Sequence, residues 1–268
     1  MKVNYNKYET IKVEVKEKIA TITLNRPEQL NAVGGAVSHP ELVEVFHDVD
    51  VDEGVYACII TGAGRAFSAG GDVKMMKDMI AGKVEMPLMS EPKDLIRNII
   101  RLRKPIVAAV NGPATGLGAD LALYCDIIYM ADTARIGDPH VTVGLVAGDG
   151  GAVIWPLQIP LCKAKEFLMT GELVKGPDAE RIGLINKCVP ADQLMPTAWA
   201  MAKRFADGAI QAISWTKVCL NKILEERVNL ILDASLAYEY HSFRLPDHAE
   251  AVDAFIEKRA PKFKGGQI

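Results

Sequence analysis

The sequence has little that would commit the chain to a membrane, to export or to nucleic acid. Of 268 residues, 31 are Lys or Arg and 34 are Asp or Glu, so the net charge is only −3 and no basic surface for a phosphate backbone is indicated. The nearest approach to a membrane-spanning segment, residues 105–119, is interrupted by glycines and falls short of the roughly 18 residues required. Residues 1–15 lack the apolar segment of a secretory signal. We therefore expect a cytoplasmic protein that binds neither nucleic acid nor membrane.

Cysteine and histidine are sparse, with five residues of each. The cysteines are Cys58, Cys125, Cys162, Cys188 and Cys219. They form no CxxC pair, and their odd number argues against a disulfide framework, so we expect reduced, buried, small apolar side chains. The histidines show no HExxH pattern and no cluster with ligand spacing, so no metal site is expected.

The first two thirds of the chain have the pattern of short strands separated by glycine-rich turns. Residues 11–15 and 20–24 alternate apolar and polar side chains, which predicts an antiparallel pair. Short apolar runs typical of buried strands follow at 56–60, 106–110, 127–131 and 184–189. A mixed α/β core is therefore expected.

The last part of the chain has a helical pattern. Asp192 is a suitable N-cap for a helix that runs to about Ala206, and apolar residues then recur at three- and four-residue intervals. We expect two units, an α/β core over residues 1–191 and a helical region over residues 192–268.

The spacing of the glycines excludes a nucleotide-binding fold. In three candidate stretches the third glycine of a dinucleotide fingerprint falls on Phe67, Leu121 or Val153. The candidate phosphate loop at 171–176 is followed by Pro177, where such a loop needs Lys. The glycines must serve another purpose.

Ser68 stands in the segment AFSAG, one residue away from the GxSxG turn of serine hydrolases. In those enzymes a strand leads directly into the serine turn, whereas here Gly62 and Gly64 end the strand earlier. A serine nucleophile stays open as an alternative, but a small hydroxyl that fills a tight loop is favoured.

Two segments share one design, an apolar strand that turns through glycines into Gly-x-Asp at a helix start. They are residues 60–73 and 109–123. The first N–H groups of a helix have no helical partner, so two such loops side by side can direct one amide each, from Ala69 and Leu117, at a single carbonyl oxygen. Loss of one donor from such an oxyanion hole typically costs about 10²–10³ in rate. The alternative is that the glycines only permit tight turns.

Five stretches of the chain, in their order and spacing, resemble the crotonase (enoyl-CoA hydratase/isomerase) superfamily. They are LNRPEQLNAV (24–33), TGAGRAFSAGGDVKMM (61–76), KPIVAAVNGPATGLGADLALYCDI (104–127), IGDPHVTVGLVAGDGG (136–151) and FIEKRAPKF (255–263). The resemblance implies a spiral of ββα units followed by a C-terminal helical trimerisation region, with trimers that often pair into hexamers.

The resemblance also implies an acyl-CoA thioester as substrate, held with its carbonyl oxygen between the amides of Ala69 and Leu117. The other positions carried over as substrate- or CoA-binding are Glu28, Gln29, Gly70, Gly71, Asp72, Val73, Gly116 and Lys258. No cofactor is implied, because coenzyme A is part of the substrate.

At the positions of the two glutamates of family hydratases this chain has Asp120 and His140. Aspartate keeps carboxylate chemistry with a shorter reach, and histidine exchanges protons near neutral pH, so this pair can still perform acid–base catalysis. Asp149, in AGDGG, lies in a loop that borders the acyl pocket in the family. We expect Asp120 to be the main acid/base, with His140 and Asp149 assisting. Helix capping is the alternative for Asp120 and for Asp149, and a structural role is the alternative for His140.

The function implied by the resemblance is the addition of water to a 2-enoyl-CoA through a thioester enolate. Within the family, double-bond isomerisation and hydrolysis of a β-dicarbonyl CoA ester are the alternatives. A non-catalytic acyl-CoA-binding protein is the alternative from another class. The residues alone leave these choices open.

Overall fold

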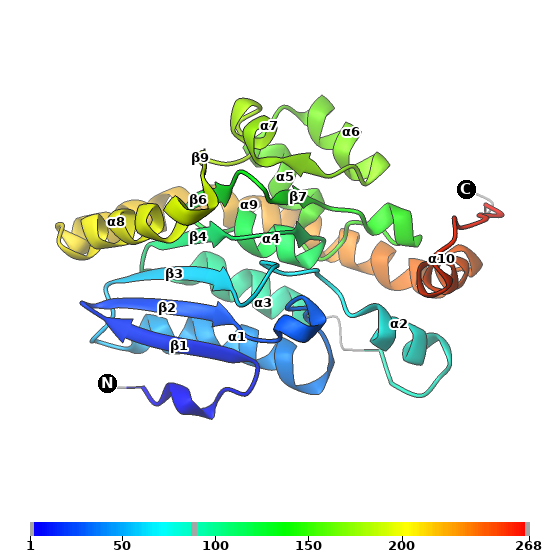
Figure 1. Ribbon diagram of the computed structural model, residues 1–268, viewed down its shortest axis with the longest axis horizontal. Helices are drawn as coiled ribbons and strands as arrows, with labels where there is room; N and C mark the ends of the chain where they lie inside the picture. Colours follow the sequence, from blue (N-terminus) through cyan, green and yellow to red (C-terminus); the bar gives the residue numbers. More distant parts are fainter. Residues whose placement is uncertain (1–2, 87–89, 266–268) are drawn as a thin grey trace.

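The computed structural model describes residues 3–86 and 90–265, in which a six-stranded sheet has the order β1-β2-β3-β4-β6-β9 (Figure 1). Its strands are β1 (Ile11–Lys16), β2 (Ile19–Leu24), β3 (Ala57–Gly62), β4 (Ile106–Val110), β6 (Ile127–Ala131) and β9 (Lys187–Val189). The predicted antiparallel pair is confirmed, with Val13 opposite Ile22, and every later neighbour in the sheet is parallel. A smaller sheet has the order β5-β7-β8, formed by β5 (Ala114–Thr115), β7 (Arg135–Gly137) and β8 (Val174–Lys175).

The bounds of the predicted strands agree best with those in the structure where the sequence is fully apolar. β4 and β6 have the expected bounds, and all five residues of β4 are buried. β9 is shorter than the predicted 184–189, because Leu184 and Ile185 are buried in the turn that follows α7 (Gly176–Arg181) instead of pairing in the sheet.

Helices cover the sheet and continue its hydrophobic core. The α-helices not yet given are α1 (Gly35–Val51), α2 (Val73–Ile80), α3 (Ser90–Arg101), α4 (Leu117–Leu123), α5 (Gly151–Gln158), α6 (Leu161–Thr170), α8 (Leu194–Ala206), α9 (Ile210–Ser242) and α10 (Pro246–Glu257). Four short 3₁₀ helices are η1 (Tyr5–Lys7), η2 (Pro27–Gln29), η3 (His140–Val143) and η4 (Ala191–Gln193). α8 packs on β3, β4 and β6, and α9 packs along α3 and α5.

The C-terminal helices form as expected, but Asp192 is not the N-cap of the first of them. Asp192 lies within η4, and α8 begins two residues later at Leu194 without a side-chain cap. The carboxylate of Asp192 instead accepts a hydrogen bond from the side chain of Gln193. Buried residues of α8 and α9, such as Ala198 and Leu232, belong to the same hydrophobic cluster as the sheet, so these two helices pack as a continuation of the core.

The cysteine prediction is right for two residues and wrong for two. Cys58 and Cys125 are buried, Cys188 is intermediate, and Cys162 and Cys219 are exposed on helix surfaces; all five are free thiols. Cys162 lies on α6 and Cys219 on α9, and neither is covered by another described element.

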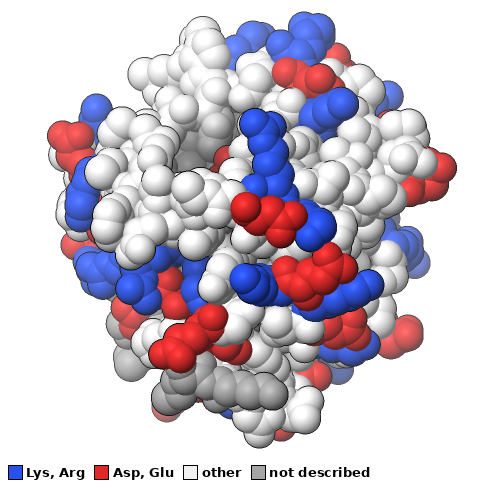
Figure 2. Space-filling model, turned by 90° about the vertical axis from the view of Figure 1, so that its left-hand side faces the viewer, with Lys and Arg blue, Asp and Glu red and all other residues white. Residues whose placement is uncertain are grey.

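The surface carries both signs of charge. On the face drawn in Figure 2, Lys and Arg alternate with Asp and Glu around a largely uncharged hollow, without a continuous basic area. Among the described helices, none is both long and apolar enough to cross a membrane.

Candidate active site

The two glycine-rich loops lie side by side, as their shared design predicts. Ser68 pairs with Ala114 in an isolated parallel bridge, and the N–H of Thr115 donates to the carbonyl of Ser68 at 3.0 Å. Gly70 has φ +75°, and a Cβ there would stand 2.3 Å from the carbonyl oxygen of Thr115. Glycine is therefore required at this position for the loops to approach each other.

The expected amide donor in the first loop is corrected by the structure. The N–H of Ala69 donates to the carbonyl of Leu30 at 2.9 Å, so it is not available to a substrate. Gly71 and Leu117 instead both line a cavity, and their N–H groups have no hydrogen-bond partner among the described residues. Leu117 is the first residue of α4, where the helix itself offers no acceptor.

Ser68 is not placed as a nucleophile. Its side chain is fully buried, and its hydroxyl donates to the carbonyl of Asn31 at 2.8 Å while it accepts from the N–H of Gly70. A hydroxyl used in this way stabilises the loop and cannot reach a substrate, so the serine hydrolase alternative is wrong.

The cavity has a volume of about 690 Å³, which suits a small-molecule ligand. Much of its wall is apolar, and Met75, Met76, Met79 and Phe243 contribute to it. Polar side chains come from several elements that are distant in sequence. They are His39, Glu85, Glu91, His140, Asp149, Glu239 and Tyr240.

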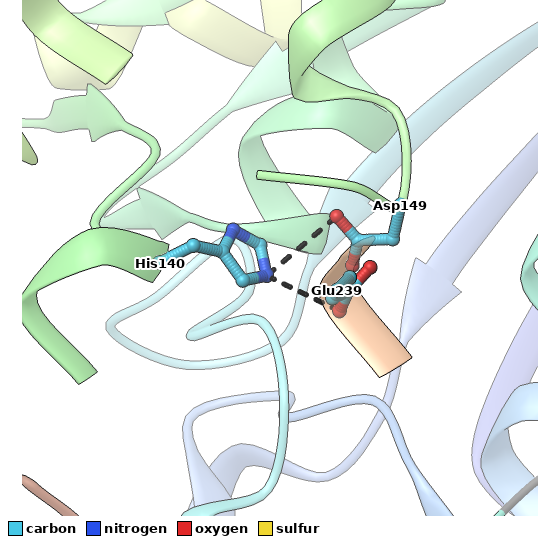
Figure 3. A group of neighbouring side chains, drawn as sticks. All are labelled: His140, Asp149 and Glu239. Atoms are coloured by element: carbon cyan, nitrogen blue, oxygen red, sulfur yellow. Dashed lines mark ion pairs between the residues drawn. The ribbon is translucent and has the colours of Figure 1, made fainter. Parts of the chain in front are cut away.

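Three of these polar residues converge on one point (Figure 3). The Nε2 atom of His140 lies 3.6 Å from Oδ1 of Asp149 and 4.0 Å from Oε1 of Glu239. Both distances exceed a direct hydrogen bond and leave room for a small atom to interact with all three groups.

His140 is oriented from behind by Asp138, whose carboxylate forms a close contact with the imidazole Nδ1. Burial lowers the pKa of the His140 imidazole, but the charges of Asp138 and Asp149 outweigh burial, and the pKa is raised well above its ordinary value. The arrangement therefore favours an imidazolium whose Nε2 faces the cavity.

Glu239 was not predicted. It lies on α9, is 5% exposed, and its Oε2 atom has no partner among the described residues. Burial, reinforced by the charge of Asp149, raises the pKa of Glu239 well above its ordinary value. A sequence signal did exist: Glu239 continues the buried stripe Leu232, Ser235, Leu236 at helical spacing, and a carboxylate in such a stripe is rarely left buried without a purpose.

Asp149 does not cap α5, because Gly150 occupies the N-cap position and no side-chain cap bond is formed. The Oδ1 atom of Asp149 has no hydrogen-bond partner in the described chain and faces His140. The capping alternative is therefore wrong, and the carboxylate is free to act in the cavity.

Asp120 is close to this group but does not line the cavity. It is fully buried in α4 behind Gly150, and neither carboxylate oxygen has hydrogen-bond geometry with a described group. Burial, followed by the charges of Asp138 and Asp149, raises the pKa of Asp120 well above its ordinary value. Of the three predicted catalytic residues, His140 and Asp149 therefore line the cavity, and Asp120 does not.

The positions carried over for CoA binding differ in their surroundings. Asp72 caps α2, accepting from the N–H groups of Lys74 and Met75, and Val73 begins that helix. Gly116 packs against His140, with room for no bulky side chain. Three others are exposed and lie outside the cavity lining: Glu28, Gln29 and Lys258.

The same three cavity groups have the spacing of metal ligands. One ligand atom each from His140, Asp149 and Glu239 lie within 4.8 Å of one another, so a divalent cation can in principle be held here. The sequence spacing gave no hint of this arrangement, because the residues lie on three separate elements.

Comparison with known proteins decides the family. The sequence profile described as enoyl-CoA hydratase/isomerase matches residues 14–266. The chain belongs to this family. It is 36% identical over 260 residues to a probable enoyl-CoA hydratase of Mycobacterium bovis, covering 96% of this chain and 98% of that protein. It is also 35% identical to a short-chain-enoyl-CoA hydratase of Clostridium acetobutylicum, covering 92% and 94% of the two chains.

The fold of the enoyl-CoA hydratase/isomerase family is confirmed by solved structures. A crystal structure of a family member from Mycobacterium paratuberculosis superposes with a TM-score of 0.85 at 39% identity, covering 92% of this chain and 98% of that one. The mixed α/β fold with C-terminal helices is therefore as expected from the sequence.

Proposed function

We propose that the protein adds water to a 2-enoyl-CoA thioester. The observation that carries this proposal is that one cavity presents both two unpaired backbone amides and three titratable side chains. Family membership and relatives named as enoyl-CoA hydratases support the same reaction class.

In the proposed complex the thioester oxygen accepts hydrogen bonds from the N–H groups of Gly71 and Leu117. These donors are fixed by the paired loops before substrate arrives, so they stabilise the negative charge of the enolate without reorganisation. Gly71 takes the place that was expected for Ala69, and Leu117 keeps its expected role.

Acid–base chemistry is assigned to Asp149 and Glu239, with His140 between them. The Asp149 carboxylate takes a proton from water as the hydroxyl bonds to C3, and the Glu239 carboxylic acid supplies the proton that bonds to C2. His140 lies within 3.6–4.0 Å of both groups and returns the proton from Asp149 to Glu239 after each turnover. In this scheme Asp120 does not touch substrate, and its expected part as the main acid/base passes to the other two carboxyl groups.

The decisive experiment follows the loss of the conjugated thioester absorbance when crotonyl-CoA and longer 2-enoyl-CoA esters are added to the protein. Steady hydration that is lost in His140→Ala, with the variant still folded, supports the proposal. Saturable binding of the esters without turnover of any of them would instead favour a non-catalytic acyl-CoA-binding protein.

One observation favours a second candidate, the hydrolysis of a β-dicarbonyl CoA ester. An imidazole held by a buried carboxylate, as His140 is by Asp138, is a common arrangement for directing water at a carbonyl carbon. Incubation with a 3-oxoacyl-CoA, followed by chromatography of the products, distinguishes the two reactions: water that attacks C3 breaks the C2–C3 bond and gives acetyl-CoA and a carboxylic acid shorter by two carbons, whereas hydration forms neither product.

We also propose a homo-oligomer, either a trimer or a hexamer formed by two trimers, in the cytoplasm, with no cofactor beyond the CoA of the substrate. One side of α9 exposes large apolar side chains that nothing in the described chain covers, which is typical of subunit interfaces. They are Trp215, Leu220, Ile223, Leu230 and Tyr238. Sedimentation equilibrium of the wild type and of Leu220→Glu tests this proposal, because a charge on the interface should shift the protein towards monomer.

A further inference from the structure

Besides His140, Asp149 and Glu239, another polar side chain that lines the cavity has a nitrogen atom without a hydrogen-bond partner among the described residues. His39, on α1, is 9% exposed, and its Nδ1 atom has no hydrogen-bond partner among the described residues. Burial lowers the pKa of the His39 imidazole, despite the opposing charges of Glu91 and Asp149. The ring is therefore neutral near pH 7, and a buried neutral nitrogen without a partner costs free energy unless a ligand or water supplies one.

Glu91, on α3, stands across from this nitrogen. Its Oε2 atom is 4.0 Å from Nδ1 of His39, too far for a direct hydrogen bond. Two hydrogen bonds of about 2.8 Å that meet on one oxygen atom at roughly 90° span this gap. A single small polar group can therefore bond both residues at once.

The chemistry of the two residues defines that group. A carboxylate accepts hydrogen bonds only, whereas the neutral imidazole can present Nδ1 as a donor. In the tautomer with a proton on Nδ1, a group that bonds both residues accepts from Nδ1–H and donates to Glu91, which a hydroxyl does. A carbonyl oxygen can only accept hydrogen bonds, so it has no proton to donate to the carboxylate of Glu91. The carboxylate of Glu91 would repel a second carboxylate.

The position of His39 within the cavity relates it to the acyl part of a substrate. Met75 and Met79, which line the cavity with it, offer no hydrogen bond comparable to those of the imidazole. His39 and Asp149 line the same cavity, to which the reacting carbons are assigned. A polar group in this mostly apolar wall selects among ligands, because ligands that lack a matching group leave it unpaired.

We propose that His39 and Glu91 bind a hydroxyl group on the acyl chain, so that the enzyme prefers 2-enoyl-CoA esters that carry a hydroxyl beyond C3. This inference rests on the proposed function for its reaction, but the hydroxyl preference is also measurable as binding. His39 acts here as a specificity-determining residue and takes no part in proton transfer to the reacting carbons.

The test compares trans-2-octenoyl-CoA with its 6-, 7- and 8-hydroxy derivatives. For the wild type we expect at least one hydroxylated ester to have a kcat/KM about 5- to 30-fold above that of the unsubstituted ester, the gain typical of one or two hydrogen bonds. In His39→Phe this ratio should fall to about one, and Glu91→Gln should lower it partially. Met79→Leu, which changes the apolar wall of the same cavity, should keep the wild-type ratio.

Equal kcat/KM for all four esters, or a preference that persists undiminished in folded His39→Phe, would overturn the inference while leaving the hydratase proposal standing. If no ester is hydrated, the proposed function fails, and the inference is then decided by calorimetric binding of octanoyl-CoA and its hydroxylated derivatives. Tighter binding of a hydroxylated ester to the wild type but not to His39→Phe supports it, and equal binding refutes it. Should His39→Phe not fold, as judged by its melting curve, His39→Gln replaces it, with a reduced ratio as the supporting result.

Discussion

Replacement of Glu239 by Gln is the most direct test of the proposed chemistry. Burial raises the pKa of Glu239 well above its ordinary value and so favours the neutral carboxylic acid, and an amide of almost the same shape is also neutral. The amide cannot release a proton to C2. General acid–base catalysis typically contributes about 10²–10⁴ in rate, so kcat should fall by that factor, or about 3–5 kcal/mol in the activation free energy.

The assay is the initial rate of absorbance loss with crotonyl-CoA, together with KM and the melting temperature. KM and the melting temperature should change little, because the substitution leaves the cavity wall and its charge nearly as they are. Asp120→Asn is the matched control: it also converts a buried carboxyl to an amide, but at a residue that does not line the cavity, and it should retain activity to within about tenfold. Near-normal turnover in Glu239→Gln, combined with an inactive but folded Asp120→Asn, would refute the assignment and restore Asp120 as the acid/base.

Three further predictions address the amide donors, the buried carboxyl and the metal alternative. Leu117→Pro removes one N–H at the first position of α4, where proline is tolerated, so kcat should fall by about 10²–10³ while the melting temperature is largely retained; full activity would exclude this amide from the oxyanion hole. Because the pKa of Asp120 is raised in the folded state, its contribution to stability is greatest below the pKa of the unfolded chain and is lost as pH rises towards the folded pKa. The melting temperature of Asp120→Asn should therefore increase relative to wild type between pH 4 and pH 8, and a constant difference across this range would contradict the burial argument. Treatment with EDTA should leave the initial rate unchanged, since the proposal uses His140, Asp149 and Glu239 as proton-transfer groups; loss of activity that Zn²⁺ or Mn²⁺ restores would show that the three residues hold a metal instead.

Local pattern was enough to predict most of the strands in the six-stranded sheet, the helical C-terminal region and the paired loops, but not the smaller sheet. The apolar runs that form β4 and β6 are stable only in the interior of a parallel sheet, so the bounds of both strands could be predicted from the sequence. Motif order and spacing were likewise enough to indicate the family that the profile match confirmed. The first helix cap was not predictable in the same way, because the short turn of η4 competes with the capping role of Asp192.

The composition of the candidate active site could not be predicted from the sequence alone. Whether the amide of Ala69 or that of Gly71 is free depends on the carbonyl of Leu30, which approaches only when η2 packs against the loop. Glu239 joins His140 and Asp149 because α9 packs along α5, although about 90 residues separate it from them in sequence. Local sequence specifies which backbone conformations and buried faces form, since these depend on neighbours a few residues away. Which hydrogen-bonding groups remain unpaired, and which charges meet, depends on contacts between distant segments and is decided only when the elements pack together.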